Sequence, residues 1–228
     1  MFGKVISFFA ENKPLPPPPF TLTGGVETTV GADKVVTFAS SGTLNVSGSG
    51  IVKVLVVAGG MNGGVGDAIE PGFSTGAGGR GGEVVYDASF AITSGSYTIT
   101  VGGSGQNSSF STITANANTG ALGGAAKTID GNGSAGSAGT TSTITGSSYV
   151  YASGGGSGAY WSSYNGGAPG TGGGTGGNTS FTVPQDGSNG TNYGSGGGGA
   201  AFGFTSTYAV SNPGSGAGGV IIFRYTPN

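Results

Sequence analysis

The sequence contains no cysteine and no histidine, and only 7% of its 228 residues are charged. These absences exclude disulfides, thiol nucleophiles, iron–sulfur clusters, histidine-based acid–base catalysis and the usual zinc sites. Seven Lys and Arg stand against nine Asp and Glu, with no basic block, so the chain lacks the phosphate-neutralising surface of a nucleic-acid-binding protein. The composition therefore predicts a protein that is not an enzyme, has no cofactor and binds no nucleic acid.

Long apolar runs are also missing. No stretch is long enough to cross a bilayer, and the first ten residues contain too short an apolar run for a signal peptide. We therefore expect no membrane span.

Glycine is the residue in excess, with 54 copies, and the 10 prolines bring the two types to about 28% of the chain. Such a share is typical of low-complexity disorder. However, 10% of the residues are aromatic and few are charged, which is the reverse of a disordered composition. We interpret the chain as folded, with one main domain.

The N-terminal segments differ from the rest of the chain. Four apolar residues within residues 1–13 recur at helical spacing and predict a short helix or peptide with one apolar stripe. They are Phe2, Val5, Ile6 and Phe9. Residues 14–19, Pro-Leu-Pro-Pro-Pro-Pro, favour polyproline II and form a stiff spacer. Because so short a helix is marginal alone, we interpret residues 1–13 as an anchor peptide. The alternatives are a disordered or internally packed tail and a membrane-surface helix.

Residues 20–228 have a β pattern. Seven segments are rich in β-branched and aromatic residues and are bounded by Gly or Ser, which is typical of strands. They are Val35–Ala39, Thr43–Ser47, Ile51–Val57, Glu83–Tyr86, Ser96–Val101, Phe110–Thr114 and Gly219–Tyr225. The sequence predicts no long helix after residue 20, and we expect an all-β domain with a β-sandwich body.

Seven glycine tracts separate these strands, and in places glycine recurs at every third residue. The tracts are Gly59–Gly66, Gly76–Gly82, Gly120–Gly139, Gly154–Gly158, Gly166–Gly177, Gly194–Gly199 and Gly214–Gly219. Extended helices with three residues per turn approach closely only where glycine faces inward. We therefore predict polyglycine-II-like segments in parallel and antiparallel rows, with long loops; irregular glycine loops or disorder are the alternatives.

The motifs that carry chemistry are absent or non-specific. Gly-x-Gly-x-x-Gly occurs several times, as expected by chance in this composition, and no helix pattern follows it. The residues around Lys127 lack the glycines of a phosphate-binding loop. The nine carboxylates are scattered, although a calcium site around Asp67 and Glu70 or a glycosidase-type carboxylate pair stays open.

One group of aromatic residues stands among Ser and Gly. Its members are Tyr149, Tyr151, Tyr160, Trp161 and Tyr164. Tyrosine and tryptophan give rigid contact area at low entropic cost, as in antibody loops, so we predict a recognition surface. The alternative is that these rings fill the interior or a subunit contact. A second, more apolar group, which consists of Phe202, Phe204 and Tyr208, is interpreted as structural.

The order of several segments is specific. At Lys53–Gly60, a strand pattern is followed directly by glycines. Two further segments come next, Gly78–Tyr86 and Ser96–Ser104, and the domain ends with Gly216–Tyr225. Over roughly residues 25–226 this order resembles the glycine-rich domain of bacteriophage tail-fibre, adhesin and other virion proteins. The resemblance implies a β-sandwich that bears polyglycine-II-like segments and exposed loops that meet a host surface. It supplies no catalytic residues.

From the resemblance we expect a non-enzymatic structural protein at the virion surface, on the tail or the capsid. It would be a fibre or spike head that contacts other virion proteins through residues 1–19 and binds a host cell-surface glycan or protein. A homo-oligomer is expected, and a trimer suits an attachment head. The alternatives are a capsid decoration or cement protein and a carbohydrate-active enzyme. Aromatic loops that face solvent far from the N-terminus favour attachment, whereas loops buried between subunits favour decoration.

Overall fold

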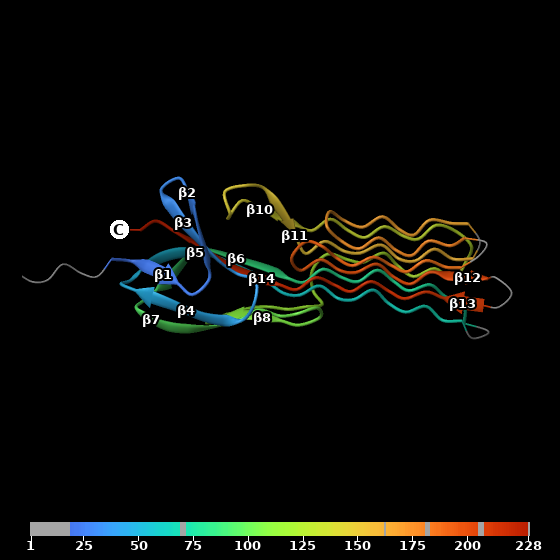
Figure 1. The fold of residues 1–228 in the computed structure, drawn as a ribbon, viewed down its shortest axis with the longest axis horizontal. Coiled ribbons are helices and arrows are strands. Elements are labelled where there is room, and N and C mark those ends of the chain that lie inside the picture. The colour runs from blue at the N-terminus through green and yellow to red at the C-terminus, as the bar shows by residue number, and fades with distance from the viewer. Residues whose placement is uncertain (1–18, 69–71, 162, 181–182, 205–207, 228) are drawn as a thin grey trace, which may run out of the picture.

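The structure is a computed structural model that describes residues 19–68, 72–161, 163–180, 183–204 and 208–227. The predicted anchor peptide, with Phe2, Val5, Ile6 and Phe9, lies outside the described residues, as does all of the spacer except Pro19. Figure 1 shows an elongated molecule, in which a body of strands at one end continues into a long rod of glycine-rich chain. In the described part of the chain, no helix has the length and apolar character to cross a membrane.

The body contains two five-stranded antiparallel sheets. The first has the order β1 (Thr21–Thr23), β4 (Gly42–Ser47), β7 (Gly95–Thr100), β8 (Ser108–Phe110) and β9 (Ile113–Ala115). The second has the order β2 (Val26–Val30), β3 (Asp33–Phe38), β14 (Val220–Tyr225), β5 (Gly50–Val57) and β6 (Val84–Ile92). Two hairpins complete the strands: β10 (Thr140–Ser142) with β11 (Tyr149–Tyr151), and β12 (Phe202–Phe204) with β13 (Tyr208–Val210). All regular elements among the described residues are strands, which confirms the all-β prediction.

The main core lies between the two sheets. The side chains of Val54 and Phe223 face this core from adjacent strands of the second sheet. Phe110, from the first sheet, packs edge-on against Phe223, with ring centroids 4.7 Å apart. Tyr225 also faces inward, and its hydroxyl accepts a hydrogen bond from the Leu22 amide at 3.1 Å. Two sheets that share one apolar interior are consistent with a β-sandwich.

A second, smaller core covers the outer face of the second sheet. Alternate residues of β5 and β14, such as Leu55 and Ile222, point away from the sandwich interior. The β10–β11 hairpin covers them with Tyr151 and Ile144, both of which are buried. The second sheet is therefore buried on both faces along part of its length, which explains the uninterrupted apolar run in β5.

One strand prediction needs correction. The segment Phe110–Thr114 does not form a single strand, because β8 ends at Phe110 and β9 begins at Ile113. The two strands pair with each other across a tight turn, in which Ser111 has a φ of 51°. Alternation alone did not reveal this turn, since neither glycine nor proline marks it.

The rod consists of extended segments that are not paired in flat sheets. Along residues 154–159, six successive backbone amides donate to three neighbouring segments in turn, and the order repeats after three residues. The bonds run from Gly154 to Ser137, Gly155 to Gly79, Gly156 to Gly174, Ser157 to Ser134, Gly158 to Gly76 and Ala159 to Gly177. A β-ladder alternates between two directions, whereas this segment bonds in three.

Close approach of the backbones requires glycine in the rod. A Cβ atom at Gly156 would lie 1.9 Å from the Gly167 carbonyl oxygen, and one at Gly158 would lie 1.9 Å from the Ala200 carbonyl oxygen. Real Cβ contacts essentially never fall below 3.0 Å. The rod therefore packs backbone against backbone, and the side chains buried in it are small, such as those of Ser157 and Ala200.

Two glycines of the same tract test this packing. A Cβ at the buried Gly214 would lie 1.9 Å from the Ser188 carbonyl oxygen, whereas one at Gly218 would be 3.5 Å from its nearest neighbour, the Gly102 carbonyl oxygen. Gly214→Ala should lower the free energy of unfolding by about 2–4 kcal/mol, because the neighbouring backbone must move. Gly218→Ala should change it by less than about 1 kcal/mol, in the stabilising direction. Urea denaturation measures both, and equal losses in the two variants would contradict close packing.

Candidate functional site

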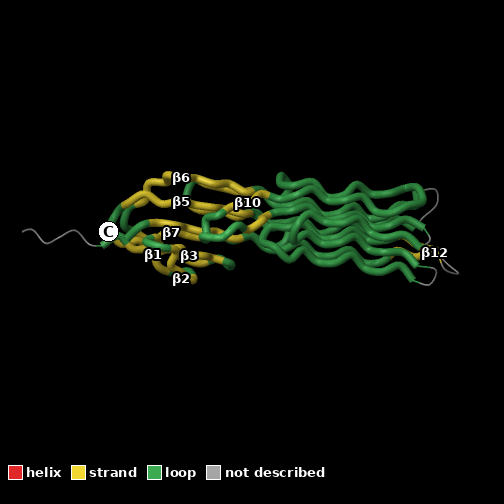
Figure 2. The backbone as a smooth tube through the Cα atoms, turned by 90° about the horizontal axis from the view of Figure 1, so that it is seen from above, coloured by secondary structure: helices red, strands yellow, loops and turns green. Residues whose placement is uncertain are grey.

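Six aromatic rings gather at the end of the rod that is farthest from the body. We call this group the tip cluster; it consists of Phe73, Tyr160, Trp161, Phe202, Phe204 and Tyr208. In Figures 1 and 2, β12 lies at this end, opposite the end where the described chain terminates. The cluster therefore occupies one extremity of the molecule.

Local backbone structure brings these rings together. The β12–β13 hairpin pairs Phe202 with Val210 and Phe204 with Tyr208, so the rings of Phe202 and Phe204 come from alternate residues of one strand. Residue Tyr160, at the end of a rod segment, bridges to Phe202. The Trp161 amide then donates to the Phe202 carbonyl at 2.7 Å. A rod segment and a hairpin distant in sequence are thus joined at the tip.

The cluster has a buried base and an exposed outer layer. Phe202 is fully buried and Tyr160 is nearly so, and their ring centroids are 5.0 Å apart. Phe204 and Tyr208 are 45% and 43% exposed, respectively. The partly exposed Trp161 stacks on Phe204 at 5.6 Å with an interplanar angle of 8°. The outer rings therefore offer flat apolar faces to a ligand, while the inner rings hold them in place.

The Trp161 backbone is strained. Its φ is 76°, in the left-handed region that bulky residues rarely adopt. Strain of this kind persists only where the surroundings enforce it, and it is frequent at functional sites. Here the stacking on Phe204 and the hydrogen bond to Phe202 hold the residue in place. The ring of Trp161 is therefore fixed in orientation, which lowers the entropic cost of binding.

The tip carries little charge. Burial raises the pKa of Tyr160, and the nearby Asp130 carboxylate and Tyr208 raise it further, so its hydroxyl stays neutral. Among the described residues, no group of three or more His, Cys, Asp or Glu side chains could hold a metal ion. Of the two residues considered for calcium, Asp67 forms a β-bridge with Ser74, and Glu70 lies outside the described residues.

The five aromatic residues that the sequence grouped together do not form one surface. Tyr149 and Tyr151 lie on β11, next to the body, where Tyr149 contacts Tyr151 at 4.7 Å and Tyr193 at 6.4 Å. Tyr160 and Trp161 belong to the tip cluster. A segment that runs the length of the rod separates the two pairs in space (Figure 1).

The five residues also differ in how much of each side chain is exposed. The rings of Tyr151 and Tyr160 are only 2% and 8% exposed, so they fill the interior and offer no contact surface. Tyr164 is partly buried and is tied to Thr179, whose amide donates to the Tyr164 carbonyl at 2.9 Å. Trp161 is the candidate of this group that is both partly exposed and inside an aromatic surface.

Sequence reasoning missed three members of the tip cluster. Phe204 and Tyr208 were interpreted as structural, yet both are substantially exposed. The alternation of Phe202 and Phe204, with Tyr208 shortly after them, was a signal for a hairpin with rings on one face. Phe73 contacts Phe202 at 5.2 Å and Tyr208 at 4.5 Å, and nothing in its sequence surroundings pointed to that position.

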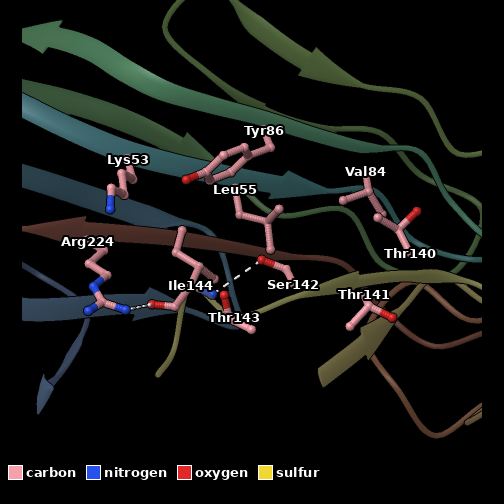
Figure 3. Close-up of a pocket in the computed structure, with 10 residues that line it drawn as sticks. All are labelled: Lys53, Leu55, Val84, Tyr86, Thr140, Thr141, Ser142, Thr143, Ile144 and Arg224. Carbon is pink, nitrogen blue, oxygen red and sulfur yellow. Dashed lines mark hydrogen bonds between the residues drawn. The ribbon is translucent and has the colours of Figure 1, made fainter. Parts of the chain in front are cut away.

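A cavity of about 420 Å³ lies elsewhere, in the body of the molecule (Figure 3). It lies between the outer face of the second sheet, at β5, β6 and β14, and the residues of β10 and the turn that follows. The tip cluster and this cavity are thus separate candidate sites.

No protein-family model matches this chain, and no curated protein matches it. The structure and the chemistry of its surfaces therefore carry the functional interpretation.

The buried Tyr151 gives a pH prediction. Burial, together with the neighbouring Tyr149 and Tyr193, raises the pKa of Tyr151 from 10.0 to about 12. Because the unfolded chain loses this proton first, the stabilisation is complete below pH 10 and is lost as the pH rises towards 12. Tyr151→Phe should therefore reduce the alkaline loss of stability, measured as unfolding free energy between pH 9 and pH 12. The same slope in both proteins would contradict the burial of a neutral hydroxyl.

Proposed function

We propose that this protein is a non-enzymatic structural protein of a bacteriophage virion, the exposed head of a fibre or spike that attaches to the host surface. The observation that carries the proposal is the position of the tip cluster. Its exposed rings lie at the far end of the rod, whereas β1 and the C-terminal residues lie at the opposite end (Figure 1). A head anchored beyond β1 through residues 1–19 would present these rings outward.

We infer that the rod is a bundle of polyglycine-II-like segments. The threefold order of hydrogen bonds along residues 154–159 supports this, because such a helix has three residues per turn and directs its amides in three directions. The same segment runs antiparallel to residues 76–79 and parallel to residues 174–177. A bundle cross-linked in this way is stiff, and a stiff spacer suits a head that must hold a binding surface away from the particle.

The chemistry of the tip suits a glycan or protein on a cell surface. Flat rings such as Trp161 and Tyr208 stack on the apolar faces of sugars and also form the centres of protein interfaces. The exposed area is small, so one copy would bind weakly. Several copies in a homo-oligomer, a trimer for example, would gain from effective concentration.

The attachment test uses two exposed tyrosines at opposite ends of the rod. Tyr208 is 43% exposed in the tip cluster, and Tyr193 is 37% exposed beside Tyr149. Fluorescently labelled protein is added to a panel of bacterial strains with different surface glycans, and bound protein is measured by flow cytometry. Tyr208→Ala should weaken binding to a recognised strain by about 5- to 30-fold, as expected for an aromatic contact worth 1–2 kcal/mol. Tyr193→Ala should bind as the unaltered protein does.

Binding to no strain, or equal binding by the two variants, would count against attachment. If the protein instead coats phage capsids and Tyr208→Ala abolishes that coating, the protein is a capsid decoration protein. Thermal unfolding of both variants shows whether each is folded.

The proposed anchor has its own test. Removal of residues 1–19 should leave the melting temperature of the domain unchanged, because both cores are formed by later residues. The truncated protein should be absent from assembled phage particles, as measured by mass spectrometry of purified particles. Incorporation at the level of the full chain would contradict the anchor.

A further inference from the structure

The cavity in the body has an apolar floor and one aromatic wall. Its floor is the outer face of the second sheet, where Leu55 of β5 and Val84 of β6 point outward. Tyr86, the cross-strand partner of Leu55, is 51% exposed and forms the wall (Figure 3). The β10–β11 hairpin covers Leu55, which is only 1% exposed, together with Val57 and Ile222, but it leaves Val84 partly exposed. The part of the apolar floor that solvent reaches is therefore at Val84, next to the ring of Tyr86.

The opposite side of the cavity carries hydroxyl groups. Residues 140–143 are Thr-Thr-Ser-Thr, and all four line the cavity. The Ser142 hydroxyl accepts a hydrogen bond from the Ile144 amide at 3.3 Å, which ties it to the turn (Figure 3). The three threonine side chains add hydroxyls that both donate and accept. This combination of a ring, an apolar floor and several hydroxyls is suited to a polyhydroxylated ligand.

The charge of the cavity is positive. Lys53 and Arg224 line it, and no carboxylate is among the described residues that line it. The Arg224 Nε donates to the Asp33 carboxylate at 2.7 Å. Hydrogen bonds from Thr226 and Arg224 lower the pKa of Asp33, so this carboxylate stays ionised and neutralises Arg224. Lys53 takes part in no salt bridge in the described part of the chain. Its ammonium is attracted to the Asp33 carboxylate only at longer range. Lys53 is therefore a cation without a direct ion-pair partner among these residues, and a ligand carboxylate can pair with it.

We propose that this cavity binds an acidic sugar unit, such as a uronic acid. The sugar carboxylate would pair with the Lys53 ammonium, the ring hydroxyls would bond to the threonines of residues 140–143, and the apolar face would pack on Val84 and Tyr86. The volume of about 420 Å³ falls within the usual range for small-ligand pockets, about 300–1,000 Å³. The inference is independent of attachment through the tip cluster, because the two sites use different residues at different places along the molecule.

The test compares two lysines on the same sheet. Lys34 of β3 pairs with Glu27 outside the cavity, so Lys34→Met removes the same charge as Lys53→Met but leaves the cavity unchanged. Glucuronic acid and glucose are titrated into the full chain, and binding is followed by NMR chemical shifts of backbone amides. Glucuronic acid should shift amides of β5, β6 and residues 140–144, and Lys53→Met should weaken it roughly tenfold, the loss expected for one charge-assisted hydrogen bond. Lys34→Met should have no effect.

Further ligands separate the contribution of the charge to binding from that of the hydroxyl groups. Acetate carries the charge without hydroxyls, and glucose carries the hydroxyls without the charge, so both should bind more weakly than glucuronic acid. Thr141→Val, which removes one hydroxyl at nearly constant volume, should weaken glucuronic acid but not acetate. Equal affinity for acetate and glucuronic acid, or equal affinity of the two lysine variants, would overturn the proposal.

The source of the sugar is decided by a third comparison. A uronic-acid-containing oligosaccharide that binds more tightly than free glucuronic acid indicates a unit of a surface glycan, whereas equal affinity indicates recognition of the single sugar. Tyr208→Ala should leave both affinities unchanged, so failure of attachment at the tip and failure of the cavity proposal are distinguishable.

Discussion

The structure depends on the close contact of backbones that carry no Cβ atom. In the rod, carbonyl oxygens occupy the positions where side chains would otherwise stand, and the amides of successive residues donate to different neighbours. Hydrogen bonding therefore replaces the apolar core that stabilises most domains. Glycine loses more conformational freedom on folding than other residues, so the body must supply much of the stability that keeps the rod ordered.

The body sets the alignment of the rod because strands continue directly into rod segments. Beyond β5 and β6, whose last pair is Val57 with Val84, the Ala58 amide donates to the Glu83 carbonyl at 3.0 Å. Residue Gly219, just before β14, likewise donates to the Gly102 carbonyl at 2.8 Å. Strands held in register by their alternating side chains thus fix the starting positions of segments that have almost no side chains of their own.

This arrangement explains why the aromatic residues collect at the ends of the rod. Its interior has no room for a ring, so rings are found where segments meet hairpins: Tyr149 and Tyr151 next to the body, and Tyr160 and Trp161 at the tip. Residues 151 and 160 are nine steps apart along an extended chain, which at about 3 Å per step is roughly 27 Å. Nearness in sequence therefore suggested one cluster where the structure has two.

Predictions for the body succeeded where side chains alternate. Strands such as β3, β5 and β14 were expected within one or two residues, because one face of each is buried and the pattern is regular. The short strands β1 and β2 were missed, since three to five residues with few buried side chains give no clear pattern. The cavity residues were also missed, because Lys53 and residues 140–143 come from distant segments that only packing brings together.

The sequence by itself determined that the chain folds as β structure and that its glycine tracts lack side chains for an ordinary core. Only the tertiary structure decided which tract lies beside which, and therefore which rings share the tip. The physical reason is that side chains determine which segments pair with each other. One glycine segment differs little from another, so the partners of each are chosen by the strands and hairpins at its two ends.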